Sequence, residues 1–515
     1  MIVEPGFEDF ERAHDSPSGQ GPVQVVWTRL IDDLETPVSA YLKIAAGRPY
    51  AFLFESVEGG AWRGRYSIVA MNPDLVWRCR GDVAEIAEGE AIGRGAFTPQ
   101  AGGALDSMRD LVAASRLDLP PGLPPMAAGL FGAVGYDMVR LVERLAEARA
   151  DPLDLPDAIL IRPSIVAIFD AIAQEIILVT TVRPAPGDAA ALYAEARSRL
   201  AAVAADLAAS LPPRRASTAS PTSAPFVSPV GAEAYGALVE RAKEYIRAGD
   251  IFQVVPSHRF AAPYAGDPFA LYRSLRRANP SPFLFFLNFP DFQLVGSSPE
   301  ILVRLRDGLI TIRPIAGTRR RGATPAEDLA LKAELLADEK ERAEHLMLLD
   351  LGRNDVGKVA LQRHAGRNAP EATSGRPRVR VTQSFAVERY SHVMHIVSNV
   401  EGDAPDGLDP VDVLMAALPA GTLSGAPKVR AMQIIDEFET VKRGLAYAGA
   451  VGYFGADGSV DTCIVLRTGL IKDGVLHVQA GGGVVADSDP LAEYEETVQK
   501  SLAVRRAAEE AWRFG

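Results

Sequence analysis

The sequence predicts an α+β protein, and three observations support that prediction. Short apolar runs with strand-like alternation are mixed with longer segments whose apolar residues recur at helical spacing. No regular strand–helix–strand rhythm connects them, which disfavours a doubly wound parallel sheet. At 515 residues, with 48% hydrophobic and 23% charged residues, the chain is a folded protein too long for one ordinary core. We therefore expect two or three domains of mixed strands and helices.

Composition along the chain predicts four segments. Residues 1–21 are expected to form a loose leader, and residues 22–210 an N-terminal α+β domain. Residues 211–229 are rich in Pro, Ser, Thr and Ala and have few large apolar residues, which is typical of an exposed linker. Residues 230–505 begin with an amphipathic helix and then alternate strands and helices, as expected of a second domain.

The most apolar stretch of the chain runs from Ile159 to Val182. Charged residues interrupt it at three positions, so it cannot be a membrane span. Its alternation instead predicts two strands joined near Ala173. We expect no membrane partner for this chain.

Charge and cysteine content exclude several classes of function. The net charge of −12, from 66 acidic and 54 basic residues, disfavours a nucleic-acid-binding surface but leaves room for a local basic pocket. Two cysteines, Cys79 and Cys463, cannot form a disulfide framework, which favours a reducing, cytoplasmic location. The first fifteen residues are acidic and lack an apolar core, unlike a secretory signal.

Two segments predict helices that carry paired carboxylates. Residues 331–355 and 491–512 both have helical spacing, and each contains two glutamates three positions apart, which share a helix face. The pairs are Glu341 with Glu344 and Glu493 with Glu496. Such pairs are commonly solvated, but two helices together could offer four carboxylates to a hard cation such as Mg²⁺. The sequence alone leaves open whether the two helices meet.

Three glycine-containing turns follow strand-like runs, at residues 312–322, 418–428 and 478–490. Glycine lets the backbone approach a ligand and point N–H groups at it, although each segment alone could be an ordinary turn. Arg467 and Lys500 could contact carboxylates of such a ligand. The chain has no Walker A pattern and no strand–GxGxxG–helix unit, so nucleotide binding is disfavoured.

Eight motifs occur between Asp250 and Lys500 in the order found in one family. They are DIFQVV, GSSPE, RPIAGTRRRG, DEKERAEHLMLLDLGRNDVGKV, ERYSHVMHIVSNVEG, LPAGTLSGAPKVRAMQIIDE, YAGAVGYF and QAGGGVVADSDPLAEYEET. On these motifs the chain resembles the chorismate-utilising enzymes, which include anthranilate, aminodeoxychorismate, isochorismate and salicylate synthases. The resemblance implies an α+β fold of packed β-sheets flanked by helices, preceded by an N-terminal α+β domain.

The resemblance also implies a set of binding residues. Glu344 and Glu496 correspond to direct Mg²⁺ ligands, and Glu341 and Glu493 to carboxylates that act through water. The ion would bridge the ring carboxylate of chorismate and so fix its orientation. The chorismate contacts implied by the motifs are Gly317, Thr318, Tyr447, Arg467, Gly481, Gly482, Gly483 and Lys500.

Three further residues are implied in the chemistry. Addition of ammonia at ring C2 expels the C4 hydroxyl, and Glu300 resembles the general acid that protonates that oxygen. It should therefore stay protonated near neutral pH, which requires burial or a neighbouring negative charge. His395 resembles the histidine tied to the later loss of pyruvate, and Thr422 is expected to line the same pocket.

Two positions distinguish reactions within the family. Water-adding members carry a lysine base where this chain has Gln253, and aminodeoxychorismate synthases carry a nucleophilic lysine where it has Ala316. Direct amination by ammonia at C2, followed by pyruvate elimination to anthranilate, is the remaining reaction, the first step of tryptophan biosynthesis. Two alternatives stay open: component I of an aminodeoxychorismate synthase, and a non-catalytic sensor of chorismate or tryptophan.

The resemblance extends to regulation by tryptophan. The FLFES and NPSPFLFF segments resemble the family's feedback site, whose contacts here would be Glu55, Ser56, Pro282, Phe283 and Leu284. Phe283 and Leu284 replace the commoner tyrosine and methionine, so an apolar indole pocket would remain while a tyrosine hydroxyl contact would be lost.

A partner is also implied, because free ammonia is scarce at neutral pH. Neither Cys79 nor Cys463 has the setting of a glutaminase nucleophile. We therefore expect ammonia to come from a separate glutamine amidotransferase subunit.

Overall fold

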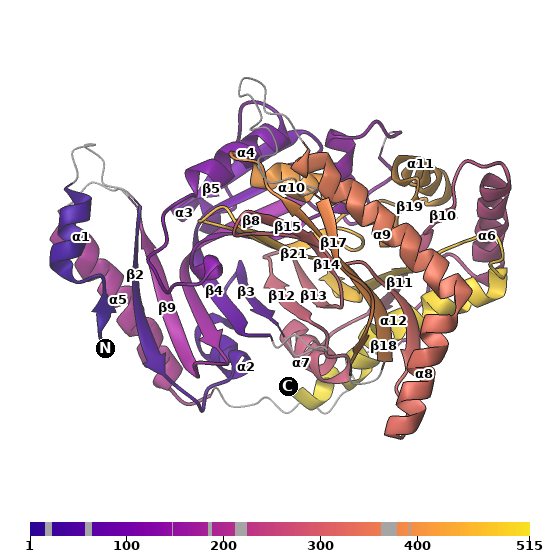
Figure 1. Ribbon diagram of the computed structural model, residues 1–515. Helices are drawn as coiled ribbons and strands as arrows, with labels where there is room; N and C mark the ends of the chain where they lie inside the picture. The colour runs from indigo at the N-terminus through magenta and orange to yellow at the C-terminus, as the bar shows by residue number, and fades with distance from the viewer. Residues whose placement is uncertain are drawn as a thin grey trace.

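The computed structural model describes residues 1–15, 23–56, 64–146, 148–183, 188–211, 224–361, 379–390 and 393–514. One sheet of 21 strands runs through the molecule (Figure 1). Strands from the first half of the chain form its middle and one of its edges. They are β1 (Val3–Glu4), β2 (Gln24–Ile31), β3 (Ala51–Glu55), β4 (Tyr66–Arg80), β5 (Val83–Glu88), β6 (Thr98–Pro99), β7 (Gly129–Val134), β8 (Ala158–Asp170) and β9 (Glu175–Val182).

Two arms of later strands extend from this middle. The first arm starts where β12 pairs with β3, and the second where β20 pairs with β7. The first contains β12 (Phe283–Asn288), β13 (Phe292–Ser298), β22 (Thr468–Lys472), β23 (Val475–Gly481) and β11 (Ser257–Pro263). The second contains β20 (Ala450–Gly455), β21 (Val460–Ile464), β14 (Ile301–Arg306), β15 (Leu309–Ile312), β18 (Val393–Asp403), β16 (Ile315–Arg320) and β17 (Val379–Arg389). A separate pair joins β10 (Gln253–Val254) to β19 (Gly425–Ala426).

Helices cover the sheet. Figure 1 shows α1 and α5 at one edge, beside β2 and β9, and α6, α8 and α9 on the opposite side. The longer helices are α1 (Phe7–His14), α4 (Ala104–Ala114), α5 (Ala189–Ala208), α6 (Ala232–Arg247), α7 (Pro268–Ala278), α8 (Pro325–Ala337), α9 (Glu339–Ala360), α10 (Pro410–Ala417), α11 (Lys428–Phe438) and α12 (Pro490–Glu510). Short turns include α2 (Pro37–Ala40), α3 (Glu90–Gly93), η1 (Tyr41–Ala45), η2 (Pro125–Ala127), η3 (Tyr136–Leu141), η4 (Gly421–Leu423) and η5 (Ala511–Phe514).

An Asp-Pro pair starts three of the helices that surround the later strands. Asp267, Asp409 and Asp489 precede α7, α10 and α12, and each carboxylate accepts a backbone N–H of the first turn. Proline follows at the first helical position, where its missing N–H leaves no hydrogen bond unmade. This local chemistry fixes the start of α12 and thereby places Glu493 in its first turn.

An aromatic cluster joins both arms to the middle of the sheet. Phe131 of β7 packs against Phe52 of β3, with ring centroids 5.0 Å apart, and against Tyr453 of β20, at 5.6 Å. Phe285 of β12 belongs to the same buried cluster. Strands from both sides of the predicted 211–229 linker thus share one sheet and one core.

The predicted strand pair at residues 159–182 is confirmed. β8 and β9 are antiparallel and separated by residues 171–174, which include Ala173. Among the described helices, none is long and apolar enough to cross a membrane.

The prediction of one helix over residues 331–355 is wrong in detail. The helix breaks at Asp338, which adopts φ −69° and ψ 111° and separates α8 from α9. Its carboxylate accepts the N–H of Glu341 at 3.1 Å, and this capping bond competes with helix continuation. On this part of the chain Leu346 is 54% exposed, whereas Leu349 is buried.

The start of the chain packs against the fold, where the sequence predicts a loose leader. Phe10 of α1 is fully buried, and Tyr193 of α5 donates its hydroxyl to the carbonyl of Pro5 at 2.7 Å. Residues 16–22 and 212–223, which include much of the predicted linker, lie outside the described residues. The proposed domain boundaries stay a prediction.

Replacing Phe10 with alanine tests whether this packing contributes to stability. Removing a fully buried phenylalanine costs about 3–5 kcal/mol, so Phe10→Ala should lower the thermal unfolding midpoint by several degrees. Leu34→Ala, at a position 90% exposed, is the control and should leave the midpoint within about a degree. Equal midpoints for the two variants would mean that the leader is loose in solution.

Candidate active site

Glu300 lies in the segment that joins β13 to β14 and is 8% exposed. Burial raises the pKa of its carboxyl to about 8, although the Thr422 hydroxyl and the positive charges of Arg467 and Lys500 oppose the shift. Glu300 and Thr422 line one small cavity of about 30 Å³, which is room for a single water. Glu300 is therefore a carboxylic acid, and a proton donor, at neutral pH.

His395 lies on β18, opposite Thr318 of β16 and Glu388 of β17. Its Nδ1 is 3.0 Å from the carbonyl oxygen of Gly317 and 3.1 Å from Oγ1 of Thr318. A carbonyl oxygen can only accept, so Nδ1 carries the proton and Nε2 of the neutral ring is the acceptor. Burial and the charge of Arg467 lower the pKa of His395, against the Gly317 carbonyl and Glu388, so the ring is neutral at pH 7.

Gly317 occupies a bulge in the pairing of β16 with β18. Its φ of +64° is unfavourable for other residues, and a Cβ there would lie 3.1 Å from both Oε2 of Glu341 and Cδ1 of Leu335. The bulge therefore brings the backbone that anchors His395 against the first turn of α9.

The glycine turn at residues 481–483 has no room for side chains because three functional groups close around it. A Cβ at the first position would lie 2.9 Å from the Tyr447 hydroxyl, and at the second 2.9 Å from Oε2 of Glu493. At the third position it would lie 2.5 Å from Nε2 of Gln253. The backbone of the turn, with no side chains of its own, therefore faces these three groups directly.

The carboxylates of α9 and α12 come close enough to influence one another. Burial, then the charge of Glu341, raises the pKa of Glu344, and Glu496 contributes in the same direction. Burial likewise raises the pKa of Glu493, again with a contribution from Glu496. Nε2 of Gln253 donates to Glu344 at 3.4 Å. The glutamates of the two predicted carboxylate helices therefore lie near one another.

Basic side chains form ion pairs with two of the four carboxylates, one on each helix. Lys500 Nζ lies 2.6 Å from Glu496 and donates to the Gly481 carbonyl at 3.1 Å, and Arg319 lies 3.1 Å from Glu341. Within the described ranges, no group of three or more His, Cys, Asp or Glu side chains is arranged to hold a metal ion.

Arg467 lies between β21 and β22 with φ +49°, a conformation uncommon for a residue with a side chain. Burial lowers the pKa of its guanidinium, and Glu300 opposes that shift. The side chain remains a permanent cation next to the acid.

The five predicted tryptophan contacts line one cavity of about 430 Å³. The pairing of β3 with β12 builds it, because Leu284 lies opposite Glu55 in register. Tyr272 donates its hydroxyl to Glu55 at 2.5 Å, and Arg276 Nε donates to it at 2.7 Å. The sequence did not indicate other lining residues, which include Tyr66, Arg304, Arg306, Arg313, Tyr390 and Tyr453.

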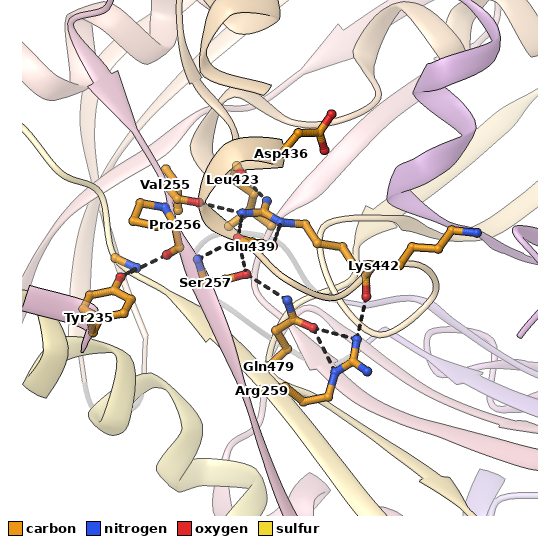
Figure 2. Close-up of polar contacts among 12 residues, drawn as sticks. Tyr235, Val255, Pro256, Ser257, Arg259, Leu423, Asp436, Glu439, Lys442 and Gln479 are labelled. Atoms are coloured by element: carbon orange, nitrogen blue, oxygen red, sulfur yellow. Dashed lines mark hydrogen bonds and ion pairs between the residues drawn. The ribbon is translucent and has the colours of Figure 1, made fainter. Parts of the chain in front are cut away.

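A buried polar network behind the site was also missed from sequence (Figure 2). Glu439 and Arg443 form a fully buried ion pair at 2.5 Å. Arg443 donates to the carbonyls of Leu423 and Val255, both at 2.7 Å, while Glu439 accepts from Ser257 N and Oγ, both at 2.8 Å. The only local signal is an i, i+4 pair of opposite charges, which is common on exposed helices.

The fold and the site define an α+β protein with a protonated buried acid, a neutral buried histidine, a bare glycine turn and two carboxylate-bearing helices. The family model for a chorismate binding enzyme matches residues 83–506. The chain belongs to the chorismate binding enzyme family, which confirms the resemblance and the α+β fold.

Individual relatives agree with this assignment. The chain is 55% identical over 509 residues to anthranilate synthase component 1 of Cereibacter sphaeroides, covering 99% of this chain and 98% of that protein. The crystal structure of anthranilate synthase component I from Streptococcus pneumoniae TIGR4 has a TM-score of 0.73 and 34% identity, covering 92% of this chain and 98% of that one. The menaquinone-specific isochorismate synthase of Escherichia coli, at 18% identity, TM-score 0.69 and 98% coverage of both chains, shares the fold.

Replacing Glu300 with glutamine tests its protonation state. The raised pKa means that the folded chain binds this proton more tightly than the unfolded chain, so Glu300 costs stability progressively as pH rises from about 4.5 to about 8. The difference in unfolding midpoint, Glu300→Gln minus wild type, should increase over that range and level off above it. Turnover should fall by about 10²–10⁴-fold. A midpoint difference that is flat with pH would mean that Glu300 has an ordinary pKa.

Proposed function

We propose that the chain forms anthranilate from chorismate and ammonia: Mg²⁺-dependent amination at C2, then elimination of pyruvate, the first step of tryptophan biosynthesis. The best support is that Glu300 is protonated and His395 is neutral at pH 7, because the reaction needs one proton donor and one proton acceptor. The 55% identical relative named anthranilate synthase component 1 supports the choice of product.

Glu300 supplies the acid for the first step. Its carboxyl stays protonated up to about pH 8 because it is buried, so it can give a proton to the C4 oxygen as ammonia adds at C2. Arg467 lies close enough to stabilise the resulting carboxylate. With a pKa of about 8, Glu300 keeps its proton near neutral pH and can still donate it during the reaction.

His395 supplies the base for the second step. Loss of pyruvate makes the substrate ring aromatic once a proton leaves its C2. Nε2 of the His395 imidazole is the nitrogen able to accept that proton. The Gly317 carbonyl fixes the proton on Nδ1 at 3.0 Å and so keeps the correct tautomer. Thr318, on the same bulged strand, positions the ring through its hydroxyl.

The carboxylates of α9 and α12 fit a magnesium site. Glu344 and Glu496 would hold the ion directly, with Glu341 and Glu493 acting through water, a donor set suited to a cation that keeps several waters. Oε2 of Glu493 is buried with no hydrogen-bond partner among the described residues, and burial with mutual repulsion raises the pKa of Glu344. When bound, Mg²⁺ neutralises the carboxylate of chorismate and orients it.

Two side chains disfavour the alternative reactions. The Gln253 amide donates to Glu344 and cannot act as a base that activates water. Ala316 lies on β16 opposite Ile396, and its methyl group cannot attack the substrate covalently. Ammonia is therefore the nucleophile that the site best accommodates.

Ammonia would come from a glutamine amidotransferase subunit. Burial raises the pKa of both Cys79 and Cys463, so neither thiol can be the nucleophile of a glutaminase. The named relatives are component 1 proteins, which agrees with a second subunit. We place the assembly in the cytoplasm, in keeping with two reduced, buried cysteines.

We assign the cavity of about 430 Å³ to tryptophan as feedback inhibitor. Phe283, Leu284 and Pro282 provide an apolar surface for an indole ring. Glu55, held by Tyr272 and Arg276, provides a fixed carboxylate for an ammonium group.

The product formed from chorismate, ammonium and Mg²⁺ distinguishes the candidate functions. We expect fluorescent anthranilate with equimolar pyruvate, measured by fluorescence and a coupled pyruvate assay. Non-fluorescent 4-amino-4-deoxychorismate would identify an aminodeoxychorismate synthase instead. Ligand binding with zero turnover would identify a sensor.

Substitution of Glu496 tests the metal site. Glu496→Gln removes one charge from the ligand set, so the Mg²⁺ concentration for half-maximal activity should rise about tenfold or more. Glu495→Gln, the neighbouring exposed glutamate on α12, is the matched control and should leave that concentration unchanged. An unchanged Mg²⁺ dependence in Glu496→Gln would show that α12 does not hold the ion.

A further inference from the structure

Tyr390 lies between the catalytic centre and the cavity assigned to tryptophan. It lines that cavity together with Phe283 and Glu55. Its ring also meets the ring of His395 edge to face, with centroids 5.6 Å apart and an interplanar angle of 65°. One aromatic side chain therefore contacts both the regulatory cavity and the catalytic base.

Polar contacts hold Tyr390 in this orientation. Its hydroxyl donates to Oε2 of Glu388 at 3.0 Å, and Arg313 donates to Oε1 of the same carboxylate at 2.5 Å. Its carbonyl accepts from Arg321 at 2.6 Å, and its backbone N–H donates to the Val393 carbonyl at 2.8 Å. Both the backbone and the ring of Tyr390 are therefore fixed.

The anchoring carboxylate belongs to the same strand pair as the base. Glu388 lies directly opposite His395 in the pairing of β17 with β18 and is 8% accessible at its side chain. Arg313, its other partner, lines the cavity as Tyr390 does. A molecule that enters the cavity thus meets Arg313 and Tyr390, the two side chains that donate hydrogen bonds to Glu388.

The segment that carries the acid borders the cavity as well. Pro299 and Ile301, on either side of Glu300, both line it. Their side chains are apolar and form no hydrogen bond with the Glu300 carboxyl, whereas the Tyr390 ring meets the His395 ring itself. Tyr390 is therefore the more direct connection.

We propose that Tyr390 is a positioning residue for His395, and that a ligand in the cavity slows the reaction by shifting the Tyr390 ring and its link to Glu388. This inference rests on the proposed reaction and on the proposed regulation by tryptophan. Because packed side chains move between discrete arrangements, a small displacement of the ring can misplace Nε2 relative to C2.

Two substitutions separate the parts of this role. Tyr390→Ala removes the ring and should lower kcat about tenfold to a hundredfold with KM for chorismate within about twofold. The aminated intermediate should accumulate, as it should in His395→Met, because the elimination step is the one that loses its base. Tyr390→Phe keeps the ring and should restore most of kcat.

The same variants test the connection to the cavity. Tyr390→Phe lacks the hydroxyl bond to Glu388, so tryptophan should bind with a Kd within about threefold of wild type while residual activity at saturation rises about fivefold or more. Binding is measured by calorimetry and residual activity by anthranilate fluorescence. Tyr245→Phe is the matched control, because it removes a tyrosine–glutamate bond, to Glu437 at 2.5 Å, far from the cavity. It should change neither quantity.

Several outcomes would overturn the proposal. Tyr390→Ala with wild-type product partition, or with a loss confined to KM, would remove the positioning role. Full inhibition by tryptophan in both Tyr390 variants would remove the connection to the cavity. Failure of wild type to bind tryptophan would refute the proposed regulation itself, while the product partition of Tyr390→Ala would still decide the positioning role. An unfolding midpoint within a few degrees of wild type shows that the variants are folded.

Discussion

The buried ion pair of Glu439 and Arg443 is the interaction on which the site depends. Two charges are taken out of water here, and the cost is offset because carbonyls, a hydroxyl and a backbone N–H complete their hydrogen bonds. The guanidinium also lies 4.8 Å from the ring centroid of Tyr136 and 5.3 Å from that of Tyr447. Tyr447 in turn lies against Gly481. One guanidinium thus joins the N-terminal half, the loop after Thr422 and the glycine turn.

The topology of the sheet explains how acid, base and glycine turn meet. The first arm carries Gly481 at the end of β23, and the second carries His395 on β18. The chain crosses from the first arm to the second between β13 and β14, and Glu300 lies on that crossing, with its carbonyl accepting from Ile464 at 3.0 Å. Because the crossing is enclosed by both arms, the carboxyl is buried and its pKa rises. The positions of Glu300 and His395 therefore follow from the order in which the strands pair.

The cavity and the catalytic centre share the same structural elements. Strands of the first half of the chain line the cavity through Glu55 and Tyr66. The crossing segment and Tyr390, beside His395, line it as well. A ligand in this cavity would contact a packed core, whose side chains move between discrete arrangements.

Local chemistry in the sequence determined many elements directly. Alternation of apolar and polar residues in 159–182 predicted two strands, and glycine motifs and ExxE spacing indicated candidate site residues that stay a prediction, because each pattern depends on neighbours a few positions away. The burial of Phe10 and the exposure of Leu346 were decided by the tertiary structure. So were the closeness of the glutamates of α9 and α12, the raised pKa of Glu300 and the position of Tyr390. These depend on pairing between segments hundreds of residues apart, whose geometry no local spacing encodes.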